Sequence, residues 1–464
     1  MRRMFEPGRP LPWAFDPLGA LRRWPRDRRL VLLHSGRFEP RWARWSLLAE
    51  PVATFDFIQE HHRDGVSRYQ GPRPSTTDLL WAHKPFGDLR RLLRTVPGPW
   101  VGYLGYELAR WVERLEVRTP LDRAWPVLEL AHCPGYLLFD GLTEAWSACG
   151  TWRDGGWPDL GDREPRTTRP QASSLRSVFS RPQYESSVQR VKDYIAAGDV
   201  FQVNLAQRFT AEFSGNDPGA CRELYGRLAG VSPAWYGAYL ELQDGRVVAS
   251  TSPELFLECD RAGRVVTRPI KGTRPASVDA AELLHSEKDT AELNMIVDLL
   301  RNDLGRVCHY GSVRVSQART IESHPTVHHG VATIEGQLHR SKDVVDLLRA
   351  TMPGGSVTGA PKVRAMQIID ELEPVRRGPY CGCVGVLSEP FTCLSIAIRT
   401  MLLDSQRNLV DFSVGGGIVA DSDPAAEYAE TLDKAQAMLQ ALGVGPGTET
   451  SKMRWPSSLP AGLT

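Results

Sequence analysis

The hydrophobic pattern changes its period within residues 181–214, and this change constrains the fold class more than any other feature of the chain. In RPQYESSVQRVKDYIAAGD the apolar residues return to one face of a helix, at Tyr184, Val188, Val191 and Ile195. Gly198 ends this pattern, and VFQVNLAQRFTAEF then alternates as a half-buried strand does. Strand patterns dominate residues 235–270, and helical patterns cover 279–304, 343–351, 361–373 and 424–442. The sequence therefore predicts an α+β fold, with sheets packed on each other and helices outside them.

The composition changes along the chain and suggests four regions. Residues 1–150 alternate apolar, strand-like runs with tryptophan-rich turns, which indicates an N-terminal α+β region. Residues 151–180 are rich in Gly, Pro, Ser and charge, so we expect a linker there. The regular patterns lie in residues 181–442, whereas residues 443–464 have too little apolar pattern to pack and are expected to be disordered.

The overall composition is that of a folded, soluble protein. Of the 464 residues, 42% are hydrophobic and 24% are charged. A formal net charge of +1, without a dense Lys/Arg block, argues against a nucleic-acid-binding protein. No apolar run approaches 18 residues and the first residues lack the apolar stretch of a signal peptide, so we expect a cytoplasmic protein without a membrane span. The eight scattered cysteines contain no CxxC pair, which favours reduced thiols over a zinc site.

The segment RPIKGTRP, residues 268–275, places a lysine between an expected strand end and a Gly-Thr turn. Only eight of the 56 basic side chains are lysines, so this chain uses arginine where a positive charge is sufficient. An amine can lose its proton and attack carbon, whereas a guanidinium cannot. Lys271 is therefore a candidate nucleophile, and the alternative is a solvated lysine beside a turn.

Two helical segments carry acids three residues apart, Asp289 with Glu292 and Glu427 with Glu430. This spacing places both carboxylates of a pair on one helix face, where they repel each other mildly. Mg²⁺ binds one or two protein carboxylates, keeps waters and accepts oxygens from a charged substrate. The second pair follows the glycine run VGGGIVADS and precedes Lys434, which suggests a site for a carboxylate substrate chelated to metal. The alternative is a solvated acidic helix face.

Two further features remain open. PGGSVTGAPKVRAMQIIDELE does not match a phosphate-binding P-loop, because Gly359 is followed by Ala360, Pro361 and Lys362. It is either a helix start that favours anions or a tight connection between a loop and a helix. His328 and His329 are adjacent, so in a strand they point to opposite faces and only one can face a site.

Several segments together resemble the chorismate-utilising enzymes, in the order of that family: FQVNLAQRF, SPELF, RPIKGTRP, AELNMIVDLLRNDLGRV, PGGSVTGAPKVRAMQIIDELEP, CGCVGVLS and GGGIVADSDPAAEYAETLDKA. They span roughly residues 180–442, and LLHSGRF with Glu50-Pro51 extends the likeness towards the N-terminus. The resemblance implies the chorismate-binding α+β fold, in which two packed antiparallel sheets are flanked by helices and sequence-distant segments interleave. The segment 151–180 is then a long surface connection rather than a domain boundary.

Within that family the motif around Lys271 separates two reactions. Anthranilate synthase large components usually have PIAGT, and aminodeoxychorismate synthases have PIKGT, as this chain does. The resemblance therefore implies amination of chorismate at C4, in 4-aminobenzoate and folate biosynthesis. In the family model Lys271 adds at C2 and expels the 4-hydroxyl, and ammonia then attacks C4 and displaces the lysine.

The resemblance also assigns roles to other residues. It implies that Glu254 protonates the departing hydroxyl, and His329 aligns with an active-site histidine. Glu292 and Glu430 would bind Mg²⁺, with Asp289 and Glu427 behind them or holding metal-bound water. Gln202 stands where relatives that add water have a lysine, which argues against water addition. The implied substrate-binding residues are Gly272, Thr273, Tyr380, Arg399, Gly415, Gly416, Gly417 and Lys434.

The sequence contains no segment that resembles a glutamine amidotransferase with its cysteine nucleophile, so we expect ammonia to come from a separate amidotransferase subunit. The nearest alternative function is that of an anthranilate synthase large component. A catalytically inactive, amino-acid-binding homologue is the alternative from another class. The presence of Glu254, Lys271, Glu292, Glu430 and Lys434 argues against it.

Related synthases also have a tryptophan site in the N-terminal region. The matching positions here are Ser35, Trp42, Ala43, Arg44, Trp45, Trp235, Tyr236 and Gly237. Ser35 would hydrogen-bond the polar end of the ligand and the loops would supply aromatic walls. The alternative is that the chain's own indoles fill this part of the core.

Overall fold

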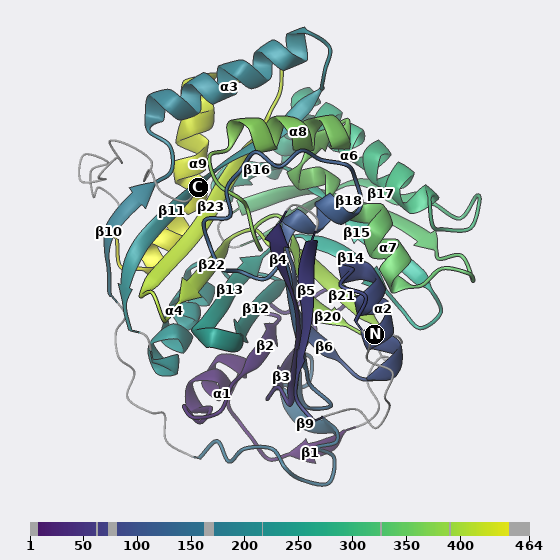
Figure 1. Ribbon diagram of the computed structural model, residues 1–464, viewed down its shortest axis with the longest axis vertical. Helices are drawn as coiled ribbons and strands as arrows, with labels where there is room; N and C mark the ends of the chain where they lie inside the picture. Colours follow the sequence, from purple (N-terminus) through teal and green to yellow (C-terminus); the bar gives the residue numbers. More distant parts are fainter. Residues whose placement is uncertain are drawn as a thin grey trace.

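Two antiparallel sheets form the centre of the protein (Figure 1). The computed structural model describes residues 8–61, 64–72, 81–161, 171–215, 217–324, 327–388 and 391–444. Within these residues, the first sheet has 12 strands, in the order β1 (Arg9–Leu11), β9 (Ala145–Gly150), β8 (Gly135–Asp140), β3 (Trp45–Ala49), β2 (Val31–His34), β12 (Tyr236–Glu241), β13 (Arg246–Ser252), β22 (Thr400–Asp404), β23 (Leu409–Ile418), β11 (Gln202–Ser214) and β10 (Gln171–Ser177), with β19 (Gly359–Ala360) paired to β11.

The second sheet has 11 strands in the described part of the chain, in the order β16 (Ile270–Pro275), β18 (Val327–Gln337), β15 (Arg264–Arg268), β14 (Leu255–Cys259), β21 (Thr392–Ile396), β20 (Cys383–Leu387), β6 (Trp100–Leu104), β7 (Leu128–His132), β4 (Ala53–His61) and β5 (Asp64–Gln70), with β17 (Arg314–Ser323) paired to β18. Both sheets combine strands from the two halves of the sequence. In the first, β2 pairs with β12, and in the second, β6 pairs with β20. The expected interleaving of distant segments is thus confirmed.

The helices lie on the outer faces of the two sheets. They are α1 (Pro17–Arg23), α2 (Pro85–Thr95), α3 (Arg181–Ala196), α4 (Pro218–Val231), α5 (Ala280–His285), α6 (Glu287–Gly305), α7 (Val344–Thr351), α8 (Lys362–Leu372) and α9 (Pro424–Ala441), with short 3₁₀ turns η1 (Tyr106–Trp111), η2 (Gln243–Gly245) and η3 (Gly355–Val357). Apolar residues of α1, α4 and α9 pack against the first sheet, and those of α2, α6 and α7 pack against the second. The α+β fold with flanking helices is therefore the observed one.

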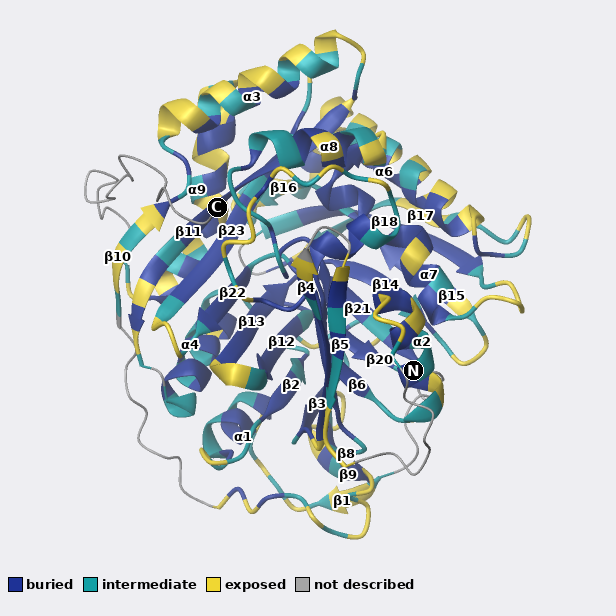
Figure 2. Ribbon diagram, viewed as in Figure 1, coloured by how far each residue is buried: buried dark blue, intermediate teal, exposed yellow. Residues whose placement is uncertain are grey.

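The core between the sheets consists of the inward-facing residues of both. Val31, Leu240 and Val248 from the first sheet pack with Val101 and Val384 from the second. Figure 2 shows the central strands almost entirely buried, whereas the exposed residues lie on the outer faces of the helices. This burial follows from the alternation of the strands, because every second side chain must face the opposite sheet.

The expected helix over residues 279–304 is in fact two helices. Ser286 separates α5 from α6 with an extended backbone (φ −68°, ψ 108°), and its Oγ accepts a hydrogen bond from the Asp289 N–H at 3.2 Å. Serine is a favoured N-cap because its hydroxyl satisfies a free N–H of the first turn. The break therefore fixes where α6 begins, and with it the direction in which its acids point.

The expected linker contains regular structure at its C-terminal end. Residues Gln171–Ser177 form β10, the edge strand that pairs with β11. Its polar sequence suits an edge position, where Ser173 and Ser174 are exposed to water. Residues 162–170 of the expected linker, and residues 445–464 of the expected tail, lie outside the described residues.

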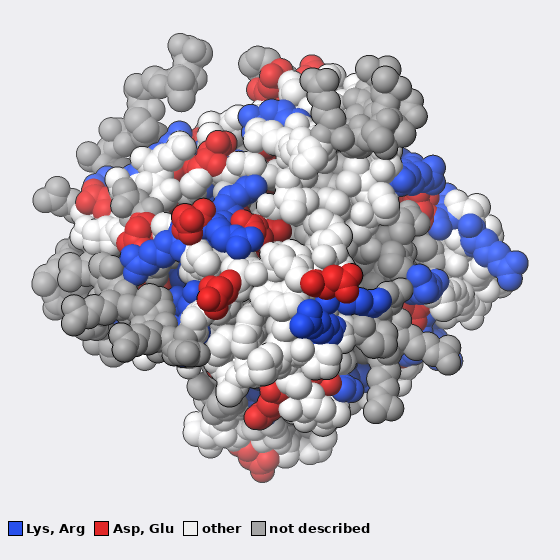
Figure 3. Space-filling model, turned by 90° about the horizontal axis from the view of Figure 1, so that it is seen from below, with Lys and Arg blue, Asp and Glu red and all other residues white. Residues whose placement is uncertain are grey.

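The distribution of surface charges and the state of the cysteines agree with what the composition predicts. On the face in Figure 3, basic and acidic side chains are interspersed rather than gathered by sign. In the described ranges, no helix combines the length and the apolar character needed to cross a membrane. All eight cysteines lie in described segments, and none of them forms a disulfide.

Candidate active site

The predicted site residues meet where β16, β23 and the start of β11 lie beside α6 and α9. Helix α9 packs on β23 and α6 packs on β16. Lys271 comes from β16, Gln202 from β11 and the three glycines 415–417 from β23. Segments more than 200 residues apart in the sequence therefore contribute to one place.

Lys271 lies at the irregular start of β16, where the register with β18 shifts between Ile270 and Thr273. Its Nζ is 3.3 Å from the point that a Cβ on Gly417 would occupy. Among the described residues the amine makes no hydrogen bond or ion pair. Burial lowers the pKa of Lys271, and the nearby carboxylates of Glu292 and Glu254 offset this only in part. The amine is thus held closer to its neutral form than a surface lysine.

Glu254 lies in the short connection between β13 and β14 and is 5% exposed. Its Oε1 accepts a hydrogen bond from Ser356 Oγ at 2.5 Å. Burial raises the pKa of Glu254 to about 7, although the hydrogen bond from Ser356, the charge of Lys271 and the N–H of Ile270 act in the opposite direction. A carboxyl group with this pKa can donate a proton at neutral pH.

The two predicted acid pairs face each other across the site. Burial raises the pKa of Glu292, and Asp289 and Glu430 raise it further against the effect of Lys271. Burial also acts on Glu430, but its pKa is lowered because Lys434 Nζ lies 2.7 Å from its Oε1. The effect of Glu430 on Glu292, together with that of Lys288 and Lys271 on Glu430, is consistent with α6 and α9 presenting their acids to one place.

The ion pairs and hydrogen bonds of the acidic side chains decide how well each carboxylate can bind a cation. Asp289 is paired with Arg274 at 2.7 Å, and Glu427 accepts a hydrogen bond from Ser422 at 2.6 Å. Glu292 has neither an ion pair nor a hydrogen bond within the described residues. No group of three or more potential ligands is arranged to hold a metal in the described segments. The residues therefore fit Mg²⁺ only as a cation that keeps waters and takes further oxygens from a substrate.

The glycines of β23 keep the floor of the site free of side chains. A Cβ on Gly417 would lie 2.0 Å from Gln202 Nε2, and one on Gly416 would lie 2.9 Å from Glu427 Oε2. Lys434 Nζ also donates to the Gly415 carbonyl at 2.8 Å. Gly272 has φ +79°, a conformation that glycine adopts without strain. Because Gly416 and Gly417 carry no side chain, the Glu427 carboxylate and the Gln202 amide can lie directly against the β23 backbone.

A second group of polar side chains lies around His329, which is buried on β18. Its Nδ1 is hydrogen-bonded to Thr273 Oγ1 at 2.9 Å, and its buried Nε2 has no partner. Burial lowers the pKa of His329, as do the charge of Arg399 and the neighbouring histidines. His328 points the other way and bonds Ser323, as the strand alternation predicts. His329 is thus a neutral ring with one nitrogen left for a ligand.

Three further residues that the sequence analysis named are Arg399, Tyr380 and Gln202. Burial lowers the pKa of the Arg399 guanidinium, which has no ion pair among the described side chains. Tyr380 is buried, and burial raises its pKa well above the ordinary value. Both polar atoms of the buried Gln202 amide lack hydrogen-bond partners among the described residues. These unpaired groups are typical of a site that a polar molecule fills.

Comparison with known proteins gives the family. A family model described as chorismate binding enzyme matches residues 37–440. The chain belongs to the chorismate-binding enzyme family. A relative from Escherichia coli, aminodeoxychorismate synthase component 1, is 38% identical over 431 residues, covering 89% of this chain and 93% of that protein. Anthranilate synthase component 1 of Thermus thermophilus is 39% identical over 409 residues, covering 82% and 86%.

A solved structure supports the same assignment. Anthranilate synthase component I of Streptococcus pneumoniae matches with a TM-score of 0.72 and 29% identity, covering 87% of this chain and 93% of that one. The chorismate-binding fold is thus found in both the sequence and the structural comparison, and the predicted fold class is confirmed.

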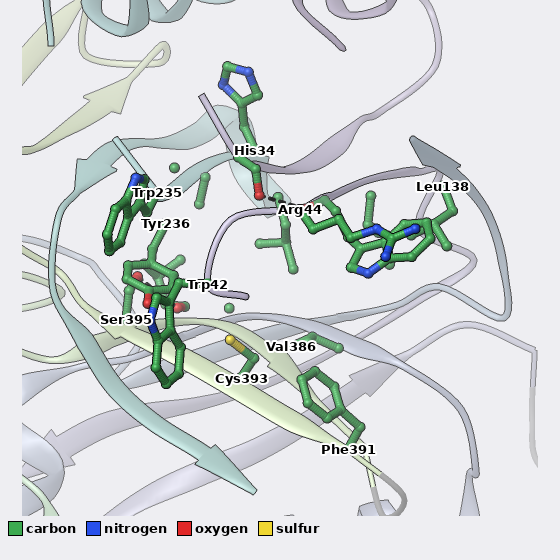
Figure 4. A pocket seen from close by; sticks show the side chains of 18 residues that line it. His34, Trp42, Arg44, Leu138, Trp235, Tyr236, Val386, Phe391, Cys393 and Ser395 are labelled. Carbon is green, nitrogen blue, oxygen red and sulfur yellow. Dashed lines mark hydrogen bonds between the residues drawn. The ribbon is translucent and has the colours of Figure 1, made fainter. Parts of the chain in front are cut away.

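A further cavity of about 90 Å³ lies between the two sheets of this chorismate-binding enzyme (Figure 4). Seven of the eight positions predicted to form a tryptophan site line it: Ser35, Trp42, Arg44, Trp45, Trp235, Tyr236 and Gly237. Ala43 is buried outside the lining, in a β-bridge with Glu39. In Figure 4 Trp42, Trp235 and Tyr236 gather on one side and Arg44 lies on the other. Residues of β20 and β21, such as Val386 and Ser395, close the cavity.

The polar groups of this cavity are only partly engaged. Ser35 Oγ donates to the Trp45 carbonyl at 2.7 Å, and Arg44 is paired with Asp140 at 2.5 Å. The buried Trp235 Nε1 has no hydrogen-bond partner. The cavity is therefore apolar, with at least one donor free for a ligand.

The sequence analysis missed residues that support the site from behind. Ser356, in the glycine-rich loop, contacts Glu254 directly. Arg377 is buried and donates to the carbonyls of Val357 and Asn204, at 2.9 and 2.6 Å, while Glu373 pairs with it at 2.6 Å. The i, i+4 spacing of Glu373 and Arg377 could have revealed their pairing, but not what they hold.

Proposed function

We propose that this protein is the synthase component that aminates chorismate at C4 to give 4-amino-4-deoxychorismate, a step of 4-aminobenzoate and folate biosynthesis. The observation that carries the proposal is Lys271, an enclosed amine of lowered pKa that lies close to the general-acid candidate Glu254. The relative from Escherichia coli bears the name of this activity. The lysine in PIKGT is the feature that favours C4 over C2 as the site of amination.

The first half of the reaction forms a covalent adduct. The neutral amine of Lys271 bonds to C2 of chorismate, the ring double bonds shift and the C4–O bond breaks. Glu254 gives its proton to the departing hydroxyl, which leaves as water. The lysine nitrogen is then a protonated secondary amine and Glu254 is a carboxylate.

In the second half of the reaction ammonia attacks the ring, and the double bonds return to their original positions. Ammonia bonds to C4, the double bonds return and the C2–N bond breaks, which frees the neutral amine of Lys271. The new ammonium group at C4 gives a proton to Glu254, so both catalytic groups return to their starting states. Chorismate and ammonia thus yield aminodeoxychorismate and water.

The remaining residues would bind and orient the substrate. His329, Thr273, Tyr380 and Arg399 would bind a carboxylate of the substrate, and Gly415–Gly417 with Gly272 would offer it their backbone N–H groups. Mg²⁺ would be held by Glu292 and Glu430, with Asp289 and Glu427 beside them. When bound, it would supply positive charge that attracts electrons towards the ring carboxylate.

Ammonia would come from a glutamine amidotransferase subunit. Such enzymes with a cysteine nucleophile need a thiol of low pKa. Burial instead raises the pKa of every one of the eight cysteines in this chain. These thiols do not fit that requirement, and the word "component" in the names of the relatives also supports a partner that hydrolyses glutamine.

The second candidate is the activity of anthranilate synthase component 1, favoured by the 39% identity to the Thermus thermophilus protein. The two reactions differ in the carbon that receives nitrogen. Incubation of the purified protein with chorismate, Mg²⁺ and an ammonium salt, followed by mass spectrometry and chromatography of the product, separates them. We expect aminodeoxychorismate. Anthranilate as the main product would overturn the proposal, and no turnover at all would favour a catalytically inactive homologue.

A further inference from the structure

We propose that Ser356 is a positioning residue for proton transfer, which holds the carboxyl group of Glu254 towards the substrate and stabilises its ionised form. This inference rests on the proposed function, because it assumes that Glu254 protonates the departing hydroxyl. It assigns a role to the loop PGGSVTGAPK, which the sequence analysis could not interpret.

The loop is buried and makes a tight connection to α8. Residues 351–360 are all buried, and Lys362, the first residue of α8, is paired with Asp303 at 2.5 Å. The interpretation as an open anion site at the helix start is therefore not supported. The only hydroxyl of the loop that reaches an acidic side chain in the described structure is Ser356 Oγ, 2.5 Å from Glu254 Oε1.

The position of this hydroxyl is fixed from three directions. Arg377 Nη1 donates to the Val357 carbonyl at 2.9 Å, and the Thr358 carbonyl accepts from the Asn204 N–H at 2.7 Å. Thr358 Oγ1 donates a hydrogen bond to the Gly354 carbonyl at 3.0 Å and so closes the turn. Helix α6 lies so close that a Cβ on Gly355 would meet Leu299 Cδ2 at 2.6 Å. Ser356 therefore has little freedom to move away from Glu254.

The charges around Glu254 come from several elements. The amine of Lys271 on β16 lowers the pKa of Glu254 whenever it carries a proton, the N–H of Ile270 donates to Glu254, and the thiol of Cys381 lies before β20. Glu292 on α6 and Glu430 and Lys434 on α9 reach it only through their effect on Lys271. Ser356 differs from all of these because it makes a directional hydrogen bond from a side chain to the carboxyl group itself.

This hydrogen bond strengthens as the reaction proceeds. While Glu254 is protonated, Ser356 donates to a neutral group. When the proton passes to the departing hydroxyl, the acceptor becomes a carboxylate, and hydrogen bonds to charged groups are about twice as strong as neutral ones. The gain occurs only as charge develops, so it accelerates the step rather than only tightening binding.

The test compares Ser356→Ala with the conservative Ser356→Thr and with Thr358→Val. The last removes a hydroxyl from the same buried loop that does not touch Glu254. For Ser356→Ala we expect kcat to fall about 10- to 100-fold with KM for chorismate nearly unchanged. The high-pH limb of the rate profile should move to higher pH, because Glu254 loses a group that stabilises its charge. Ser356→Thr should restore both kcat and the position of the high-pH limb. Thr358→Val should leave that limb in place, even if the melting temperature of this variant falls.

Glu254→Gln separates failure of this inference from failure of the proposed function. If Glu254→Gln is inactive while Ser356→Ala keeps the wild-type kcat and pH limb, the role of Ser356 is refuted and the proposed chemistry stands. If Ser356→Ala and Thr358→Val shift the limb equally, the loop acts only as a structural support and the inference also fails. If Glu254→Gln retains full activity, Glu254 is not the acid, and both the assignment and the inference fall.

Discussion

Among the lysines that the structure describes, two have a lowered pKa, and only one of these two has an amine without a bonded partner there. Burial lowers the pKa of both Lys271 and Lys362. Lys362 Nζ is held by Asp303 at 2.5 Å and by the Thr351 carbonyl at 3.0 Å, so it joins α8 to α6. Lys271 has no such partner among the described residues. An amine of lowered pKa without a counter-ion bond is more reactive than one in an ion pair, which is why we propose Lys271 rather than Lys362 as the nucleophile.

Replacement of Lys271 by alanine should abolish the covalent adduct. Aminodeoxychorismate formation should fall by at least about 100-fold, because the direct route to C4 remains closed. The adduct is measured by mass spectrometry of the intact protein after rapid quenching, and the product by chromatography. Lys84→Ala, which changes an exposed lysine ahead of α2, is the matched control and should behave as wild type. Undiminished C4 amination by Lys271→Ala would refute the covalent mechanism.

The pH profile should report Glu254 and Lys271 together. The pKa of Glu254 is raised to about 7, and as a general acid it must carry its proton, so kcat/KM should fall as the pH rises through about 7. Lys271 must be neutral, so kcat/KM should also fall towards low pH, from a point below the usual lysine range. The measurement needs a constant concentration of free ammonia at every pH. A profile that keeps rising well above neutral pH would contradict the role of Glu254.

At the scale of elements, the site depends on how α6 and α9 present their acids. The spacing of Asp289 and Glu292, and of Glu427 and Glu430, correctly predicted that each pair shares a helix face, because helical periodicity is local. The sequence could not reveal that Arg274 engages Asp289, since that contact depends on how β16 packs against α6. It also failed to predict the break at Ser286, where a cap interrupts an otherwise continuous helical pattern.

Glu292→Gln and Glu430→Gln should each weaken the binding of Mg²⁺, and so raise the Mg²⁺ requirement, while leaving the fold intact. Glu292 is half-buried and Glu430 is 52% exposed, so neither change opens the core. We expect the Mg²⁺ concentration for half-maximal activity to rise about tenfold or more, or activity to be lost. Glu287→Gln, in the exposed first turn of α6, is the control. Direct titration with Mn²⁺ in the presence of chorismate gives a reading independent of turnover. Normal metal dependence in both variants would place the metal elsewhere.

At the scale of the whole molecule, the active site exists only when both sheets are complete. Gln202, Lys271 and Gly417 meet through pairings such as β11 with β23, which join residues far apart in sequence. Local patterns predicted α3, β11 and α9 because their periodicity is strong. The order of strands could not be derived from period alone, and the resemblance to a known family supplied only the two packed sheets and the interleaving of distant segments. Neither the periodicity nor the resemblance could predict the contact between Ser356 and Glu254, since it joins side chains 102 positions apart.

We propose tryptophan as the ligand of the second cavity, since seven of the eight matching positions line it. Denaturing the purified protein should release about one tryptophan per chain, which mass spectrometry of the supernatant would detect. If the cavity is empty after purification, added tryptophan should raise the melting temperature, whereas leucine should not. The absence of both effects would show that the chain's own Trp42, Trp45 and Trp235 fill the space.

Glutamine-dependent activity should require a second chain. None of the eight cysteine thiols has the lowered pKa that a glutamine-hydrolysing nucleophile needs, and seven of them are buried. The purified protein should therefore aminate chorismate with ammonium salts but not with glutamine. Adding a purified glutamine amidotransferase component of a related synthase should create glutamine-dependent turnover, and treating that component with a thiol-alkylating reagent should remove it. The ammonium-dependent rate serves as the control, because it should survive both treatments. Steady glutamine turnover by this chain alone would contradict the prediction that a second chain hydrolyses glutamine. It would require a hydrolytic site that the buried cysteines do not offer.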